Sequence, residues 1–140
     1  MKRFGPQLSF SALVLAAAVA LSCGSSAHIP QSVVVSPAAV NAQDFPSGDV
    51  QFTATVYYNT KPSPLSPAPA SWNACSQEGP TNGVSVSNSG VAQCAAGARG
   101  TFTIYAFVAN PAFKGVCASS SLPCGGTCGG VVGMAQLTCP

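Results

Sequence analysis

Apolar and polar side chains alternate along much of the chain, and the alternation is clearest in residues 100–109. A repeat of two residues is typical of a β-strand that packs against a core on one face. The predicted buried positions of this strand are Phe102, Ile104, Ala106 and Val108. The same pattern predicts a strand at residues 50–58, whose buried positions are Val50, Phe52, Ala54, Val56 and Tyr58.

Shorter apolar runs between turn residues predict further strands. They lie at residues 32–35, 71–75, 84–87, 91–94 and 131–139, and residues 38–43 are expected to continue the first of them along the other sheet. No amphipathic run with a helical repeat follows the first two dozen residues, so no helix is expected there. Short strands at this spacing predict an all-β antiparallel sandwich, with Trp72 filling part of its core.

Two of the predicted connections are unusually long. Residues 59–70 contain four prolines, which favour an extended polyproline II conformation and cannot donate ladder hydrogen bonds. This segment is interpreted either as a docking segment for an aromatic-lined partner or, as we favour, as a stiff loop that protects a sheet edge. Residues 110–130 contain three cysteines and several glycines. A loop of that length is uncommon unless it is functional or cross-linked.

The N-terminal 22 residues have the pattern of a cleaved signal segment. Lys2 and Arg3 precede an uncharged apolar stretch at residues 8–21, which is shorter than the roughly 20 apolar residues that cross a bilayer. An uncleaved membrane anchor is the alternative. Residues 1–22 are therefore the predicted signal peptide, residues 23–31 a tether in which His28 is solvated, and residues 32–140 the folded domain.

Seven cysteines are an odd number for an exported chain, and Cys23 supplies an explanation. Its place directly after the apolar stretch, in the sequence Ala20-Leu21-Ser22-Cys23, resembles the lipobox of bacterial lipoproteins. The resemblance implies cleavage after Ser22 and a diacylglyceryl group on the Cys23 thiol. Ala20 and Leu21 depart from the residue types usual at their positions. Ordinary cleavage after Ser22 or Ala27 is the alternative.

The remaining six cysteines are expected to form three disulfide bonds, because an exported chain enters an oxidising compartment. They are Cys75, Cys94, Cys117, Cys124, Cys128 and Cys139. In an alternating sandwich, Cys75, Cys94 and Cys139 lie at the ends of strands that point the same way. The other three cysteines belong to the loop at the opposite end. Either one bond runs along the body of the domain, with the long loop folded down the sheet, or a strand is wrongly assigned. Every pairing stays open.

Removal of residues 1–22 leaves three basic and three acidic side chains, so the remaining chain is formally neutral. So few charges exclude a basic groove for nucleic acid and a polybasic membrane patch. The acidic residues are Asp44, Asp49 and Glu78. The two aspartates share one predicted turn, where calcium binding is an alternative to the ordinary role of aspartate in turns, which we favour.

The side chains that catalysis needs do not occur together in the sequence. A hydrolytic triad requires a nucleophile, a base and a group that orients the base, but the only histidine, His28, lies in the predicted tether. Cys124 and Cys128 have the spacing of half a zinc site, yet export and the lack of a nearby histidine favour disulfide bonds. We therefore expect no catalytic residues, no metal and no cofactor.

Three stretches, in this order, carry a resemblance to a known family. The first is Val33 to Pro37 followed by residues 50–55, the second is residues 70–72, and the third is residues 84–92, 95–97 and 100–104. Together they resemble the bacterial Ig-like domain of group 2, a small sandwich of surface and secreted bacterial proteins. The resemblance implies an Ig-like antiparallel β-sandwich of about seven strands, a cell-surface setting and no catalytic residues.

The chain departs from that family in three respects. The family usually lacks cysteines, and its loop before the last strand is short, whereas residues 110–130 form an enlarged, cysteine-rich insertion here. Ala98 and Arg99 are extra to the usual corner at residues 95–100.

These observations predict a non-catalytic, envelope-anchored or surface module that contacts a protein, a glycan or the cell wall, held to the membrane by a lipid on Cys23. Loops carry specificity on such scaffolds, so the contact surface is expected where residues 59–70 and 110–130 meet at one end. Nucleic acid is not an expected partner. The alternatives are a purely structural module, and a small secreted disulfide-rich inhibitor or enzyme-accessory protein.

Overall fold

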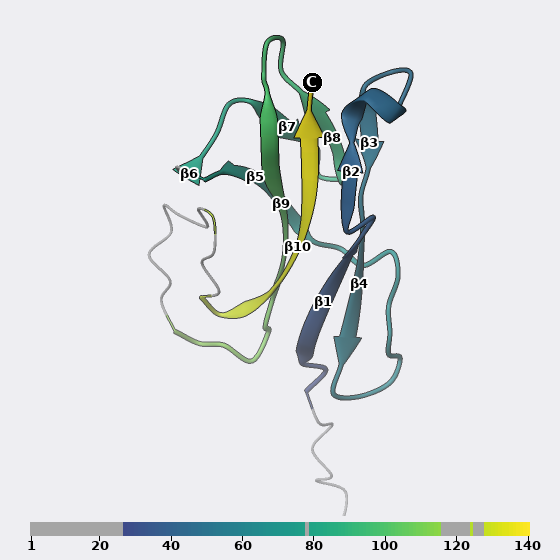
Figure 1. Ribbon diagram of the computed structural model, residues 1–140. Coiled ribbons are helices and arrows are strands. Elements are labelled where there is room, and N and C mark those ends of the chain that lie inside the picture. The colour runs from purple at the N-terminus through teal and green to yellow at the C-terminus, as the bar shows by residue number, and fades with distance from the viewer. Residues whose placement is uncertain (1–26, 78, 116–123, 125–127) are drawn as a thin grey trace, which may run out of the picture.

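The computed structural model describes residues 27–77, 79–115, 124 and 128–140, and the regular secondary structure in this part of the chain is almost entirely β-strand (Figure 1). Its strands are β1 (Pro30–Ser36), β2 (Ala39–Asn41), β3 (Asp49–Gln51), β4 (Thr53–Tyr58), β5 (Ser71–Ser76), β6 (Gly79–Pro80), β7 (Val84–Val86), β8 (Val91–Cys94), β9 (Gly100–Ala109) and β10 (Gly130–Cys139). One turn of 3-10 helix, η1 (Ala42–Asp44), follows β2. The predicted signal peptide, Cys23, Glu78 and Cys117 lie outside the described residues.

The strands form two layers in the order of a constant-type immunoglobulin sandwich. One layer runs β2-β10-β9-β5-β6, and the other joins the pair β1-β4 to the sheet β3-β8-β7. Only Phe52 separates β3 from β4, and its backbone N–H donates to the Gly90 carbonyl at 2.8 Å, so the two form one bent strand. Counting β1 with β2 and β3 with β4, and leaving out the two-residue β6, gives the seven expected strands.

The first strand changes layers at Pro37. Before it, β1 pairs antiparallel with β4; after it, β2 pairs parallel with β10, with Ala39 opposite Gln136. Proline has no backbone N–H to donate, so it is suited to the point where a strand leaves its ladder. The prediction that the chain continues along the other sheet after Pro37 is confirmed.

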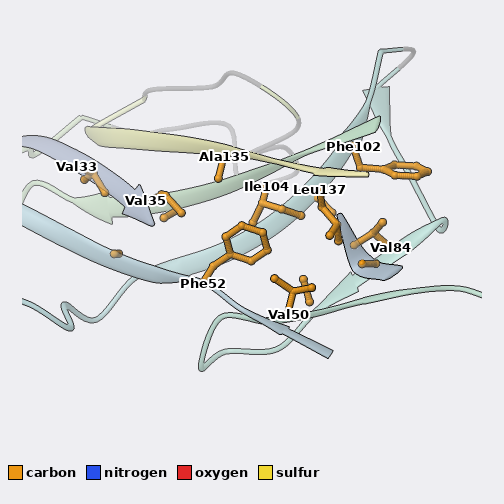
Figure 2. Close-up of a cluster of buried hydrophobic side chains, with 14 of the residues drawn as sticks. Val33, Val35, Val50, Phe52, Val84, Phe102, Ile104, Ala135 and Leu137 are labelled. Atoms are coloured by element: carbon orange, nitrogen blue, oxygen red, sulfur yellow. The ribbon is translucent and has the colours of Figure 1, made fainter. Parts of the chain in front are cut away.

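The two layers bury one apolar core between them (Figure 2). On β9 the four predicted positions are buried, whereas Thr103, Tyr105 and Phe107 between them are half-buried on the outer face. The largest side chains with no exposed surface (0 %) are Phe52, Ile104 and Leu137, contributed by both layers. No polar or charged side chain is buried among the described residues. The fold therefore rests on apolar packing, backbone ladders and disulfide bonds.

The proline-rich segment protects a sheet edge. Val56 of β4 and Leu65 exchange two backbone hydrogen bonds, at 3.0 and 2.9 Å, and the N–H of Ala68 donates to the Ala54 carbonyl at 2.9 Å. Because β8 pairs with β3 and not with β4, the same edge of β4 would be unpaired without this segment. An unpaired edge is a template for unwanted pairing with another chain, so the interpretation that we favoured for residues 59–70 is confirmed.

The expectation that His28 is merely solvated is wrong. Its ring stacks on that of Tyr58, with centroids 3.8 Å apart and an interplanar angle of 16°. Its Nδ1 lies 2.8 Å from the Thr60 hydroxyl. The N–H of Ile29 donates to Asn59 Oδ1 at 2.7 Å, and β1 begins at Pro30. The chain is therefore attached to the sandwich from His28 onward, which the sequence did not indicate because the contacting residues lie some 30 positions away.

Trp72 packs at the edge of the core, as predicted, and requires a glycine beside it. The residue is half-buried and contacts the core cluster. Gly90 has φ +83°, and a Cβ there would lie 2.5 Å from the Phe52 carbonyl oxygen and 2.9 Å from the Trp72 ring. A side chain at this position must therefore displace either the backbone of the bent strand or the indole.

We expect Gly90→Ala to lower the free energy of unfolding by about 2–4 kcal/mol, because left-handed backbone strain and overpacking add. Gly97→Ala is the matched control: φ is +79°, but nothing lies within 4 Å of the added Cβ, so only the strain of about 1 kcal/mol applies. Urea denaturation of both variants measures the difference. Equal losses in the free energy of unfolding would show that the Trp72 ring and the Phe52 backbone move aside without cost, and the packing argument would then be wrong.

Candidate functional site

The strands separate two ends of the molecule, which we call proximal and distal. At the proximal end β1 begins, and the turns at residues 59–64 and 110–115 lie there, since Pro30 pairs with Tyr58 and Gly130 with Ala109. At the distal end Cys139 pairs with Gly100, next to η1 and residues 45–49 and 95–99. The ten-residue ladder between β9 and β10 spans about 30 Å. The two ends are clearly distinct surfaces (Figure 1).

A hollow of about 560 Å³ opens at the distal end. Its polar lining comes from Gln43, Asp49, Gln93 and Arg99, and the small residues 95–98 form one wall. The Gln93 side-chain amide donates to the Asp49 carboxylate, which holds two of these groups in fixed positions. Arg99 is exposed and makes no ion pair within the described residues. Its guanidinium is therefore available to a ligand.

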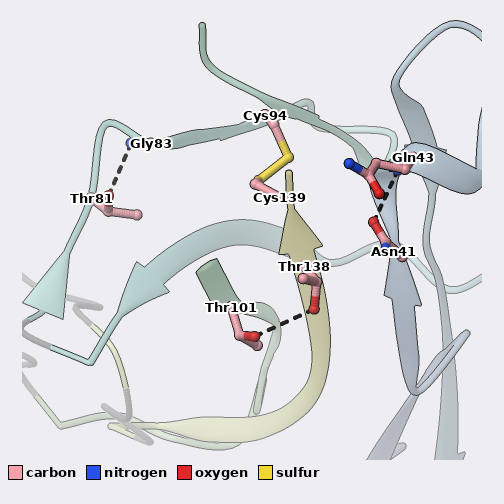
Figure 3. The surroundings of a disulfide bond; sticks show 8 residues. All are labelled: Asn41, Gln43, Thr81, Gly83, Cys94, Thr101, Thr138 and Cys139. Carbon is pink, nitrogen blue, oxygen red and sulfur yellow. Dashed lines mark hydrogen bonds between the residues drawn. A yellow bond between two sulfur atoms is a disulfide. The ribbon is translucent and has the colours of Figure 1, made fainter. Parts of the chain in front are cut away.

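The frame of this hollow is covalently fixed. Cys94 at the end of β8 is bonded to Cys139 at the end of β10, with Cα atoms 5.9 Å apart (Figure 3). Beside it the Thr101 and Thr138 hydroxyls lie 3.3 Å apart. The bond ties the two layers together at the rim, so the wall at residues 95–99 has a fixed base.

Backbone turns shape the two sides of the hollow. On one side the N–H of Ala98 donates to the Ala95 carbonyl at 3.0 Å. On the other, the Asn41 side chain accepts from the N–H of Gln43 at 3.0 Å and caps η1, and the N–H of Gly48 donates to the Phe45 carbonyl at 2.9 Å. The sequence marked Ala98 and Arg99 only as extra corner residues; the structure shows that both line the hollow.

The lining of the hollow supplies hydrogen-bond donors and acceptors. His28 lies at the proximal end, on Tyr58, so Asp49 cannot orient it as the base of a hydrolytic triad. Asp44 and Asp49 both lie near the distal end, but no group of three or more metal-ligating side chains is found in the part of the chain that the structure describes.

Two disulfide bonds show which of two alternatives holds: a bond that runs along the body of the domain, or a wrongly assigned strand. Cys94 pairs with Cys139 at the distal end, and Cys75 with Cys124. Cys75 lies opposite Thr103, whereas β10 begins opposite Ala109, roughly 20 Å further along β9. The second bond therefore brings part of the long insertion back along the body of the sheet, as one alternative required.

Only one of the two cysteines of the third predicted disulfide bond is identified. Cys128 is disulfide-bonded, while Cys23 and Cys117 both lie outside the described residues. The predicted contact loops are placed in part: residues 59–64 and 110–115 lie together at the proximal end, as expected, and residues 116–123 and 125–127 fall outside the description.

No protein-family model matches the chain, and no curated protein matches it significantly in sequence. The Ig-like strand order is thus a property read from this structure. Within the described residues, no helix has the length and apolar character needed to cross a bilayer.

We predict that non-reducing peptide mapping of the exported protein will recover three linked pairs. Two are Cys75 with Cys124 and Cys94 with Cys139. The third is Cys117 with Cys128, because the lipid proposed for Cys23 leaves Cys117 as the remaining thiol. A peptide linking Cys23 to Cys128 would contradict both the pairing and the lipid. Reduction before digestion is the control and must abolish all linked peptides.

Proposed function

We propose that this chain is an exported, lipid-anchored and non-catalytic Ig-like module that binds a polar glycan of the cell envelope in its distal hollow. The lipid on Cys23 is supported by cysteine parity, because five of the other six cysteines are already disulfide-bonded in the described residues. One partner remains to be supplied for Cys128, and Cys117 supplies it.

The observation that carries the proposal is the separation of the hollow from the end at which the chain enters the sandwich, close in sequence to Cys23. Five positions separate Cys23 from His28 in the sequence, so the tether can reach at most about 18 Å. The body then adds about 30 Å between the proximal and distal ends. A domain held in this way presents the hollow away from the membrane, where wall and surface polymers are found.

The chemistry of the lining supports a hydroxyl-rich ligand. Gln43 and Gln93 offer amides, Asp49 a carboxylate and Arg99 a guanidinium, groups that together match the donors and acceptors of sugar hydroxyls. The volume of about 560 Å³ lies within the range of roughly 300–1,000 Å³ typical of small-molecule sites. No large apolar side chain lines the hollow, so a hydrophobic ligand would gain little there.

That same polar lining favours a second candidate, a structural module with no ligand of its own. Binding sites are usually lined by apolar and aromatic groups with a few polar ones, and this hollow has only small and polar residues. Under this alternative the domain acts as a spacer, and the hollow is filled by water.

Binding of the non-lipidated Cys23→Ser protein to isolated peptidoglycan and to N-acetylglucosamine oligosaccharides distinguishes the two candidates. We expect saturable binding that Arg99→Gln and Asp49→Asn each weaken about tenfold, since each removes a charged hydrogen-bonding group. Isothermal titration calorimetry provides the affinities.

Lys61→Gln is the matched control, because it removes the same charge as Arg99→Gln but at the proximal end. Its affinity should equal that of the parent. Absence of binding to every glycan would favour the structural module. Binding that Arg99→Gln and Asp49→Asn leave unchanged would place the site elsewhere.

A further inference from the structure

Charged side chains segregate between the two ends of the domain. In the described residues, Lys61 and Lys114 both lie at the proximal end, exposed, on the turns at residues 59–64 and 110–115. Asp44, Asp49 and Arg99 lie at the distal end. Among the charged side chains that the structure describes, the proximal end is therefore positive and the distal end net negative.

A large apolar side chain stands beside one of these lysines. Phe113 is 45 % exposed, and its position is fixed by the turn that carries it. The N–H of Phe113 donates to the Asn110 carbonyl at 3.0 Å, and the N–H of Asn110 donates to the Gly129 carbonyl at 2.7 Å. The ring lies directly over Gly129, where a Cβ would come within 2.4 Å of it. Phe113 is therefore held at the surface in one orientation.

Lys61 is carried by an equally constrained turn. The N–H of Asn59 donates to the Ile29 carbonyl at 3.0 Å, and the N–H of Tyr58 donates to the Ser63 hydroxyl at 2.9 Å. These contacts join the turn to the first described residues of the chain, where His28 stacks on Tyr58. The lysine and the point at which the chain enters the sandwich are therefore parts of one rigid surface.

We propose that the proximal end is a membrane-facing surface on which Lys61, Lys114 and Phe113 contact the headgroup region of an anionic bilayer. This inference rests on the proposed lipid anchor. The described chain begins at Ala27, on this surface, and the proposed lipid lies only four positions before it. Positive charge attracts anionic headgroups, and an exposed aromatic ring partitions into the interface.

Two lysines alone bind an anionic membrane only weakly, at a level measurable at low ionic strength and high lipid concentration, but they orient a domain that is already held there. Each basic residue near an anionic surface strengthens binding roughly fivefold. A tether of at most about 18 Å keeps the local concentration of the domain high, so weak contacts become occupied. The few charged side chains cannot form a polybasic patch. The fold nevertheless places both lysines at the proximal end.

The test uses the non-lipidated Cys23→Ser protein with vesicles of phosphatidylglycerol and phosphatidylethanolamine, compared with vesicles of phosphatidylcholine, in a sedimentation assay at low ionic strength. We expect binding to the anionic vesicles only, with Lys61→Gln and Lys114→Gln each weakening it roughly fivefold. Phe113→Ser should weaken it as well. Added salt should abolish it, because the charges are exposed.

Arg99→Gln is the control, since it removes one positive charge at the distal end, and it should leave vesicle binding unchanged. Equal weakening by Arg99→Gln and Lys61→Gln would overturn the proposal, as would no difference between anionic and neutral vesicles. Because the protein lacks the lipid, and because glycan binding is measured separately, failure here is distinguishable from failure of the anchor or of the distal site.

Discussion

The antiparallel ladder between β9 and β10 is the constraint on which the rest of the structure depends. Its ten paired positions set the length of the sandwich and place Gly130 at one end and Cys139 at the other. Every functional inference follows from that separation. The first described residues lie beside the start of β10, while the hollow lies beside its end, so the proposed anchor and the proposed binding site are at opposite ends of the sandwich.

Two disulfide bonds reinforce this frame. The core of valine, alanine and a few larger side chains is continuous, but a domain of about a hundred residues keeps only a modest surplus of stability. Each disulfide contributes about 2–4 kcal/mol, a sizeable fraction of that surplus. Cys94–Cys139 secures the rim of the hollow, and Cys75–Cys124 ties Cys124 to β5.

Local pattern was sufficient to predict β9, the bent strand containing Phe52, the layer change at Pro37 and the edge-protecting prolines, because each depends on neighbours in sequence. The contacts of His28 with Tyr58 and Thr60, the disulfide pairing and the lining of the hollow were not predicted. Those features arise where segments some 30 to 50 positions apart meet, and alternation carries no information about such meetings. The group 2 family resemblance stays a prediction, although the all-β sandwich of about seven strands that it implied is confirmed.

We propose that a three-disulfide Ig-like domain is held at its proximal end by a lipid on Cys23. The intact mass of the protein isolated from its native membrane fraction, measured before and after reduction, tests this proposal. We expect a chain that starts at Cys23 and carries a diacylglyceryl group, and whose mass rises on reduction by the hydrogens of three disulfides. An unmodified chain that starts at Cys23 or at His28 would contradict it, because the domain would then have no anchor and its two ends no fixed orientation.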